Sequence, residues 1–158
     1  MNQKKVSVGA WVACVAAVLT LAALIVYSVN ISAAGYFKNA SVANLVLFSI
    51  LAICALVVAI ATGLFKLNGV GGKVLDLVGG CCQIVAVVLI TFCLINLIAA
   101  RVEGLGFIYF SNADVILEVQ TPENLASATG TIASMVCYGV AMLASIVSAF
   151  LTIRKQEA

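Results

Sequence analysis

Histidine is absent from this chain, proline occurs once, and only 9% of the residues are charged. The absence of histidine removes the commonest general base and metal ligand, and a cysteine nucleophile would have no imidazole to activate it. The glycine-rich segment "GVGGK", residues 69–73, is too short for a phosphate-binding loop, and Val74 stands where that loop needs a hydroxyl. We therefore expect a protein that is not an enzyme and that holds no cofactor and no metal.

Charge is scarce because 65% of the 158 residues are hydrophobic, with a mean hydropathy of +1.24. A soluble domain is about half apolar and roughly a quarter charged. Lipid is therefore the expected solvent for most of this chain, and we expect one all-α domain, residues 1–158, that forms a four-transmembrane-helix bundle. A bilayer core of about 30 Å takes about 20 apolar residues per helix. The expected spans are residues 6–34, 42–65, 74–100 and 122–153.

The lysine and arginine residues predict an orientation. Six of the eight fall on one side of the expected spans: Lys4, Lys5, Lys66, Lys73, Arg154 and Lys155. Lys38 and Arg101 fall on the other side. Because cytoplasmic loops carry the excess of basic residues, we expect both termini and residues 66–73 in the cytoplasm. The expected location of the protein is the plasma membrane. Attraction to anionic lipid accounts for the inner charge, so no nucleic-acid partner is expected.

The first span exceeds the roughly 7–15 apolar residues of a signal peptide, so we expect it to be retained. All six cysteines lie within expected spans, which leaves no disulfide framework outside the membrane. They are expected to pack as small hydrophobic side chains. The pair Cys81 and Cys82, near the cytoplasmic end of the third span, has palmitoylation as an alternative.

The expected outer loop, residues 101–121, contains two β-rich runs, "FIYF" and "VILEV", separated by turn-forming residues. The pattern predicts a β-hairpin of residues 107–110 against residues 115–119, followed by a helix that Thr121 caps and Pro122 begins. An isolated hairpin is marginal in water, so it would either seal the end of the bundle or dock on a partner. The residues expected to make outer-loop interactions are Phe107, Tyr109, Phe110, Asp114 and Glu118.

Small residues recur at helical spacing in every expected span, most clearly in the fourth. In membranes such faces let helix backbones approach closely. The face is expected to pack inside the bundle; alternatively, it lines a cavity or meets another subunit. The polar Gln83 and Asn96 of the third span are expected to hydrogen-bond neighbouring helices, with a permeation site as the alternative. The candidates for packing or for a pathway are Gln83, Asn96, Gly130, Ser134, Ala141 and Ser145.

Two functions remain open. The first is a non-enzymatic accessory or assembly subunit that binds the lipid bilayer, copies of itself or another membrane protein. The alternative is a homo-oligomeric small channel or transporter whose pathway lies between subunits. No ionisable residue lies well inside an expected span, which argues against proton-coupled transport.

Overall fold

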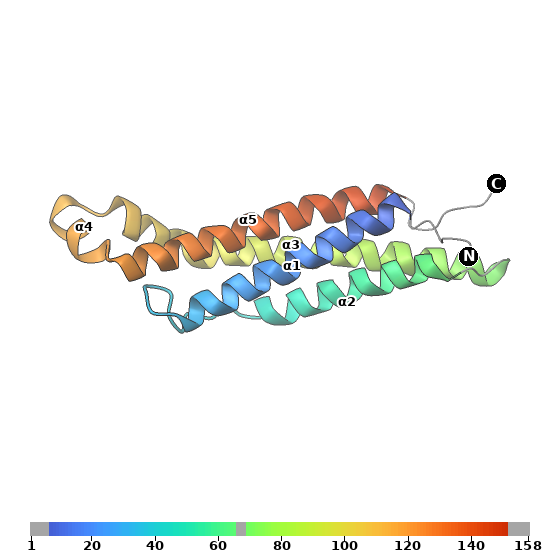
Figure 1. Ribbon diagram of the computed structural model, residues 1–158, viewed down its shortest axis with the longest axis horizontal. Helices are drawn as coiled ribbons and strands as arrows, with labels where there is room; N and C mark the ends of the chain where they lie inside the picture. The colour runs from blue at the N-terminus through green and yellow to red at the C-terminus, as the bar shows by residue number, and fades with distance from the viewer. Residues whose placement is uncertain (1–6, 66–68, 152–158) are drawn as a thin grey trace, which may run out of the picture.

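The computed structural model describes residues 7–65 and 69–151, which form five α-helices. These are α1 (Val8–Ser32), α2 (Leu45–Leu64), α3 (Val70–Phe110), α4 (Ala113–Val119) and α5 (Pro122–Phe150). The four long helices run side by side along one axis, and the short α4 lies at one end of the bundle (Figure 1). Within the described ranges no residue is in a β-strand, so the expected all-helical class is confirmed.

Each of the four long helices is long and apolar enough to cross a membrane. The chain is therefore a small multi-pass membrane protein, as its composition predicts. The bounds of α1, α2 and α5 lie within about three residues of the expected spans. The third is different: α3 has 41 residues and continues past Arg101, where the sequence predicts that the span ends.

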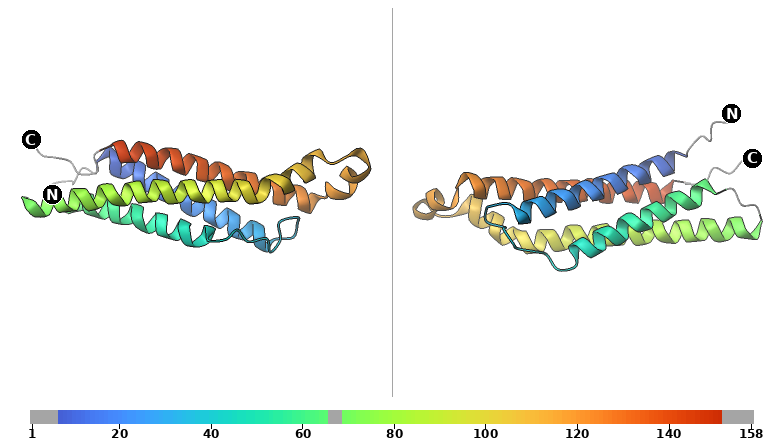
Figure 2. Two further views of the ribbon diagram at one scale, coloured as in Figure 1. Left: turned by 180° about the vertical axis from the view of Figure 1, so that it is seen from behind. Right: turned by 60° about the horizontal axis from the view of Figure 1, so that its bottom comes forward.

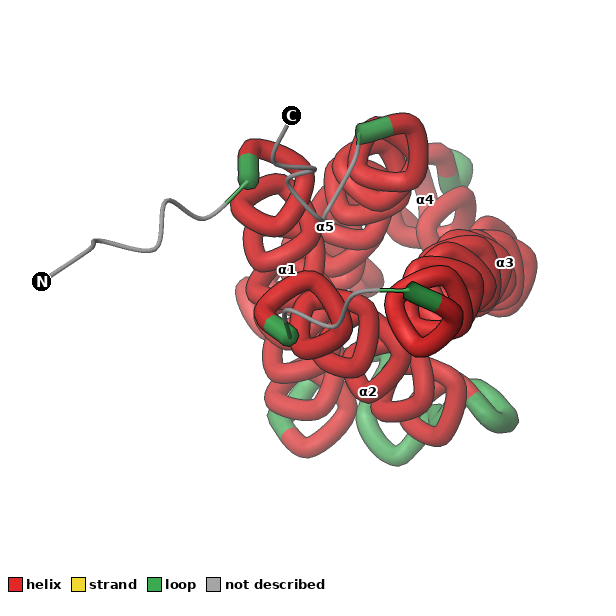
Figure 3. Tube along the Cα trace, turned by 90° about the vertical axis from the view of Figure 1, so that its right-hand side faces the viewer, coloured by secondary structure: helices red, strands yellow, loops and turns green. Residues whose placement is uncertain are grey.

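Two close helix pairs make up the bundle, α1 with α5 and α2 with α3, and the helices of each pair run in opposite directions (Figure 1). Figure 3 shows the four long helices from one end of the bundle. Contacts between α3 and α5, and between α1 and α2, join the two pairs. Alanine residues such as Ala13, Ala52 and Ala86 are fully buried where the helices meet. Because their side chains are short, the backbones approach closely and the centre of the bundle is filled. Larger buried residues, among them Tyr138 and Ile90, occupy the remaining space.

The helix starts follow local capping rules. The hydroxyl of Ser7 accepts a hydrogen bond of 3.2 Å from the backbone N–H of Ala10 at the start of α1. At the start of α5, the hydroxyl of Thr121 accepts one of 3.3 Å from Asn124, and Pro122 follows directly. The predicted Thr121–Pro122 start is confirmed, because both residues act locally at a helix N-terminus.

The predicted β-hairpin in the loop of residues 101–121 is wrong. Residues 107–110 are the last turn of α3, residues 113–119 form α4, and only Ser111 and Asn112 separate the two helices. Strand propensity depends strongly on context. Here the buried residues Arg101, Gly104 and Ile108 recur at three- and four-residue intervals along α3, which is the helical period. Burial on that face outweighs the β-branched and aromatic composition.

Candidate interaction site at the tip of the bundle

Two segments form the end of the bundle that lies opposite the start of α1 and the end of α5. The shoulder is the α1–α2 connection, residues 33–44, which folds back against the long helices. The tip is residues 105–125: the end of α3, all of α4 and the start of α5. Figure 2 shows the tip extending beyond the shoulder along the bundle axis.

Arg101 fastens the shoulder to α3. Its side chain is buried, and its guanidinium lies over the ring of Phe37 with 4.6 Å between the guanidinium carbon and the ring centroid. Its Nη2 donates a hydrogen bond to the carbonyl of Ala40. In addition, the Tyr27 hydroxyl accepts one of 2.6 Å from the backbone N–H of Val42. A cation over an aromatic face is stabilised by the ring quadrupole, so this arginine is held without an acidic partner.

Phe37 is inserted between α3 and α5. Its backbone N–H donates a hydrogen bond of 3.3 Å to the hydroxyl of Ser127. A Cβ on Gly104 would lie 2.6 Å from the Phe37 ring and 2.7 Å from the Tyr36 ring, so any larger residue there would force these rings to shift. Gly35 is equally constrained: its φ is +135°, and a Cβ there would lie 2.6 Å from the carbonyl oxygen of Glu123. The shoulder is thus anchored to both long helices beneath the tip.

The tip packs around a small hydrophobic core that it shares with Phe37 of the shoulder and Ala128 of α5. Ile108 and Val119 are buried against Phe37 and Ala128, with four partly buried neighbours: Leu105, Tyr109, Val115 and Leu125. The Gln120 side chain donates a hydrogen bond of 3.1 Å to the carbonyl of Ile108, and the Asn124 side chain donates one of 2.8 Å to the carbonyl of Val119. These bonds satisfy carbonyl groups near the C-termini of α3 and α4. The tip is therefore a folded element.

The outward face of the tip is apolar and acidic. Phe110 is 87% exposed and Leu117 is 86% exposed, and the side chains of Asp114 and Glu118 are exposed beside them in the sequence. Of the other outer-loop residues singled out in the sequence, Tyr109 joins the tip core, and Phe107 lies beside Tyr36 with 5.9 Å between ring centroids. Leu117 was missed because a strand pattern hides the helical spacing that puts it on one face with Asp114.

The packing and pathway candidates lie in the bundle interior or at its edge. Gln83 Nε2 donates a hydrogen bond of 2.8 Å to the carbonyl of Ser148, which links α3 to α5. The Ser134 hydroxyl donates one of 3.0 Å to the carbonyl of Ala23, which links α5 to α1. Ala141 is fully buried, as is Ser145, whose hydroxyl has no partner in the described part of the chain.

Gly130 and Asn96 are half-buried. A Cβ on Gly130 would lie 2.9 Å from the Asn30 side chain, whose amide donates a hydrogen bond of 2.8 Å to Thr131. The close contact of α1 with α5 therefore depends on this glycine. For Asn96, the described residues offer no hydrogen-bond partner.

A central polar cluster was not found from the sequence. The hydroxyls of Ser49 and Tyr138 lie 2.7 Å apart, and the Cys93 sulfur lies 3.4 Å from the Ser49 hydroxyl. All three side chains are buried and come from α2, α5 and α3. Serine and cysteine are common in membrane helices, so only the meeting of three helices marks this cluster. Its hydrogen bonds join the two helix pairs.

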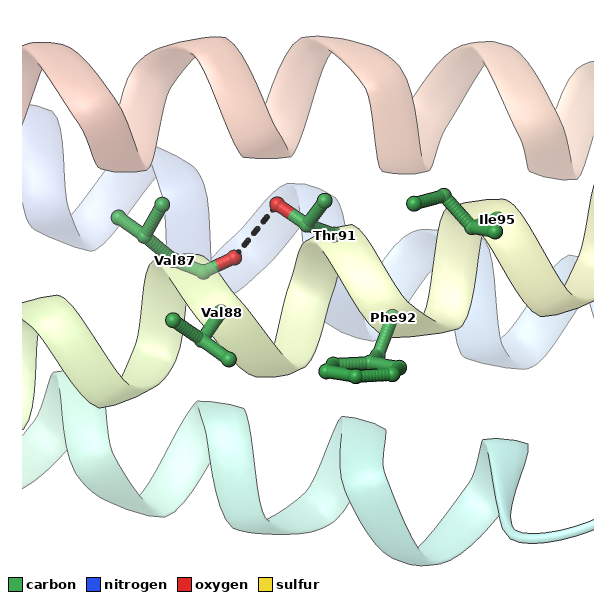
Figure 4. Close-up of a pocket in the computed structure, with 5 residues that line it drawn as sticks. All are labelled: Val87, Val88, Thr91, Phe92 and Ile95. Atoms are coloured by element: carbon green, nitrogen blue, oxygen red, sulfur yellow. Dashed lines mark hydrogen bonds between the residues drawn. The ribbon is translucent and has the colours of Figure 1, made fainter.

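A shallow apolar groove of about 190 Å³ lies on the outer surface of α3. It is lined by Val87, Val88, Thr91, Phe92 and Ile95, which Figure 4 shows on the face of α3 between α5 and α2. The only hydroxyl in this lining, on Thr91, donates its hydrogen bond to the carbonyl of Val87 at 2.8 Å. The groove is therefore a surface that suits lipid acyl chains.

No family model, curated protein or solved structure matches this chain. In the ranges that the structure describes, no three His, Cys, Asp or Glu side chains are grouped so that they could hold a metal ion. The fold itself defines the class of the protein, a small multi-pass membrane protein that carries a folded helical tip at one end.

Proposed function

We propose that this protein is a non-enzymatic accessory or assembly subunit that binds another membrane protein through its tip. One observation supports the proposal above the others. The tip is folded around a core that it shares with Phe37 and Ala128, yet it leaves two large apolar side chains, Phe110 and Leu117, almost fully exposed. Exposed apolar surface on a folded element is typical of an interaction site.

The position of the tip along α3 explains why lipid does not cover these side chains. Residues 77–100 contain no charged residue, so the hydrocarbon layer of about 30 Å ends close to Arg101. Phe110 lies nine residues farther along the helix, about 14 Å at a rise of about 1.5 Å per residue. The headgroup layer on each side is only about 5–8 Å thick. A helix close to the membrane normal therefore carries the tip beyond the headgroups and into water.

The free energy that a partner would recover is substantial. Burial of one Phe or Leu side chain is worth about 1.5–3 kcal/mol. The fold does not use either side chain in its own packing, because Ile108 and Val119 form the tip core. A partner that covers Phe110 and Leu117 would gain this energy at the centre of its interface, where large apolar residues contribute most.

The interior of the bundle supports a role that does not require transport through one chain. The described helices meet through fully buried alanine residues, and Gln83 and Ser134 use their polar groups in hydrogen bonds between helices. With respect to orientation, we propose a plasma-membrane protein with the tip outside and both termini in the cytoplasm. The support is the positive-inside rule, since only Lys38 and Arg101 lie at the tip end.

The test compares two serine variants of equal exposure. Phe110→Ser combined with Leu117→Ser removes the apolar surface of the tip, and Phe150→Ser removes a phenylalanine that is 86% exposed at the opposite end of the bundle. Native mass spectrometry of protein extracted gently from its own membrane should find a hetero-complex for the wild type and for Phe150→Ser. The tip variant should be found without its partner. A complex that survives in the tip variant would contradict the proposal.

The alternative is a homo-oligomeric channel or transporter with a pathway between subunits. Asn96 favours it, because a half-buried amide without a hydrogen-bond partner in the described part of the chain is free to contact a second copy or a solute. In liposomes, Asn96→Leu should then reduce solute flux while the oligomer persists. Unchanged flux through an intact oligomer would count against this pathway.

A further inference from the structure

We infer that the partner of the tip is a cationic amphipathic segment of another protein, in which Lys or Arg residues flank apolar side chains. This inference rests on the proposed function, because it concerns the same surface. It adds the chemistry of the partner, which follows from how the charges and the apolar side chains of the tip are arranged.

The helix α4 presents two chemically different faces. Val119 is buried and Val115 is partly buried on the side that packs into the tip core. Asp114, Leu117 and Glu118 are exposed on the side of α4 away from the core, since Leu117 and Glu118 follow Asp114 by three and four residues. Leu117 therefore lies on the same side of α4 as two carboxylates, and Phe110 is exposed at the end of the preceding helix.

The carboxylates at this end of the molecule lack cationic partners. Glu103, Asp114, Glu118 and Glu123 are exposed, and none of them makes an ion pair within the described ranges. No lysine or arginine occurs from residue 102 to residue 151. The negative potential of the tip is therefore not compensated by the chain itself, and it favours a positively charged partner surface.

The same charges disfavour the two other occupants of an exposed apolar surface. A second copy of this chain would bring four more carboxylates, with Lys38 as the one exposed cation near the shoulder, since the side chain of Arg101 is buried. A membrane surface offers no net positive charge to these carboxylates, and a helix close to the membrane normal carries the tip beyond the headgroup layer. A cationic segment with apolar side chains would cover the exposed Phe110 and Leu117 and would also pair with the carboxylates.

The first experiment identifies what lies against Leu117 in the native membrane. The photoreactive residue p-benzoylphenylalanine is placed at position 117 of the full-length protein and, as a control, at Leu143, which is 59% exposed on the lipid-facing side of α5. After illumination, mass spectrometry identifies the adducts. The probe at position 117 should capture a peptide of another protein in which Lys or Arg flanks apolar residues, whereas the probe at position 143 should capture lipid.

The outcomes separate the two proposals. A captured peptide that is neutral or acidic would overturn the cationic partner and leave the proposed function standing. An adduct at position 117 with lipid or with a second copy, or no adduct there, would overturn both.

A second measurement tests the charge directly. With the probe kept at position 117, Asp114→Asn combined with Glu118→Gln should lower the yield of the adduct about tenfold, the size expected from two exposed charge pairs. Glu103→Gln, a charge change on α3 outside the tip, should lower it less than about twofold. The wild-type yield should also fall when salt is raised to about 1 M, where the screening length shrinks to about 3 Å. A yield that is insensitive to both changes would overturn the inference.

Discussion

The bundle and the tip differ in which apolar side chains they bury and which they leave exposed. In the bundle, small residues face inward and residues such as Val57 and Leu143 are exposed, which is the stable arrangement when the solvent is lipid. In the tip, Ile108 and Val119 are buried in a conventional core, and Phe110 and Leu117 are exposed. An exposed leucine therefore has a different meaning in each region: along α5 it faces lipid, whereas on α4 we propose that it contacts a partner.

The largest effect is expected when the core of the tip is emptied. Ile108→Ala removes most of a fully buried side chain, and such changes cost about 2–5 kcal/mol. The loss should be local, so hydrogen exchange followed by mass spectrometry should find residues 105–125 opened while the rest of the bundle stays protected. Phe110→Ser is the matched control and should change stability by less than about 0.5 kcal/mol. Equal effects of the two substitutions would erase the distinction between the core and the exposed face of the tip.

The next largest loss of stability is expected where the shoulder contacts the bundle. Arg101→Ala removes the hydrogen bond to Ala40 and the cation over Phe37, and we expect a loss of about 2–3 kcal/mol. Limited proteolysis should then cut within residues 33–44 of the variant, whereas the same segment of the wild type should resist cleavage. Arg101→Lys keeps the charge but loses the planar guanidinium, so it should restore only part of that protection.

A smaller loss of stability is expected where the rings of Phe37 and Tyr36 lie close to the backbone of α3 at Gly104. Gly104→Ala forces the rings of Phe37 and Tyr36 to move and should cost about 1–3 kcal/mol in thermal or denaturant unfolding. Gly106→Ala is the control two residues away on α3, where a Cβ meets nothing within 4 Å. There alanine should stabilise the helix by about 0.5–1 kcal/mol, so the two substitutions should differ in sign.

The smallest effect is expected inside the bundle. Gln83→Leu removes the hydrogen bond to the carbonyl of Ser148, and interhelical hydrogen bonds in membranes are worth about 0.6 kcal/mol on average. A steric-trapping measurement of unfolding in bicelles resolves a change of that size. A loss of several kcal/mol would mean that Gln83 does more than join α3 to α5.

Part of the fold was predictable because it depends on local chemistry. The four spans follow from hydropathy, and the start of α5 follows from Thr121 and Pro122, whose capping roles need no distant partner. The helix of the third span was expected to end at Arg101, because a charged residue usually ends a membrane segment, whereas α3 continues to Phe110. In the fold, Phe37 and the carbonyl of Ala40 cover Arg101, so the helix continues. The exposed Phe110, Asp114 and Glu118 were identified from the sequence, and Leu117 was not.

Composition by itself determined that this is a four-span membrane protein, because partition of a helix into lipid depends on which residues it contains and hardly on their neighbours in space. Tertiary structure decided that residues 107–110 and 113–119 are helical and do not form the strands of a hairpin. Their core forms only when Phe37, about 70 residues earlier in the chain, is brought against Ile108. The same packing decided which apolar side chains are left outside, because the helix faces that turn toward Phe37 carry Ile108 and Val119, whereas Phe110 and Leu117 lie on faces that turn away.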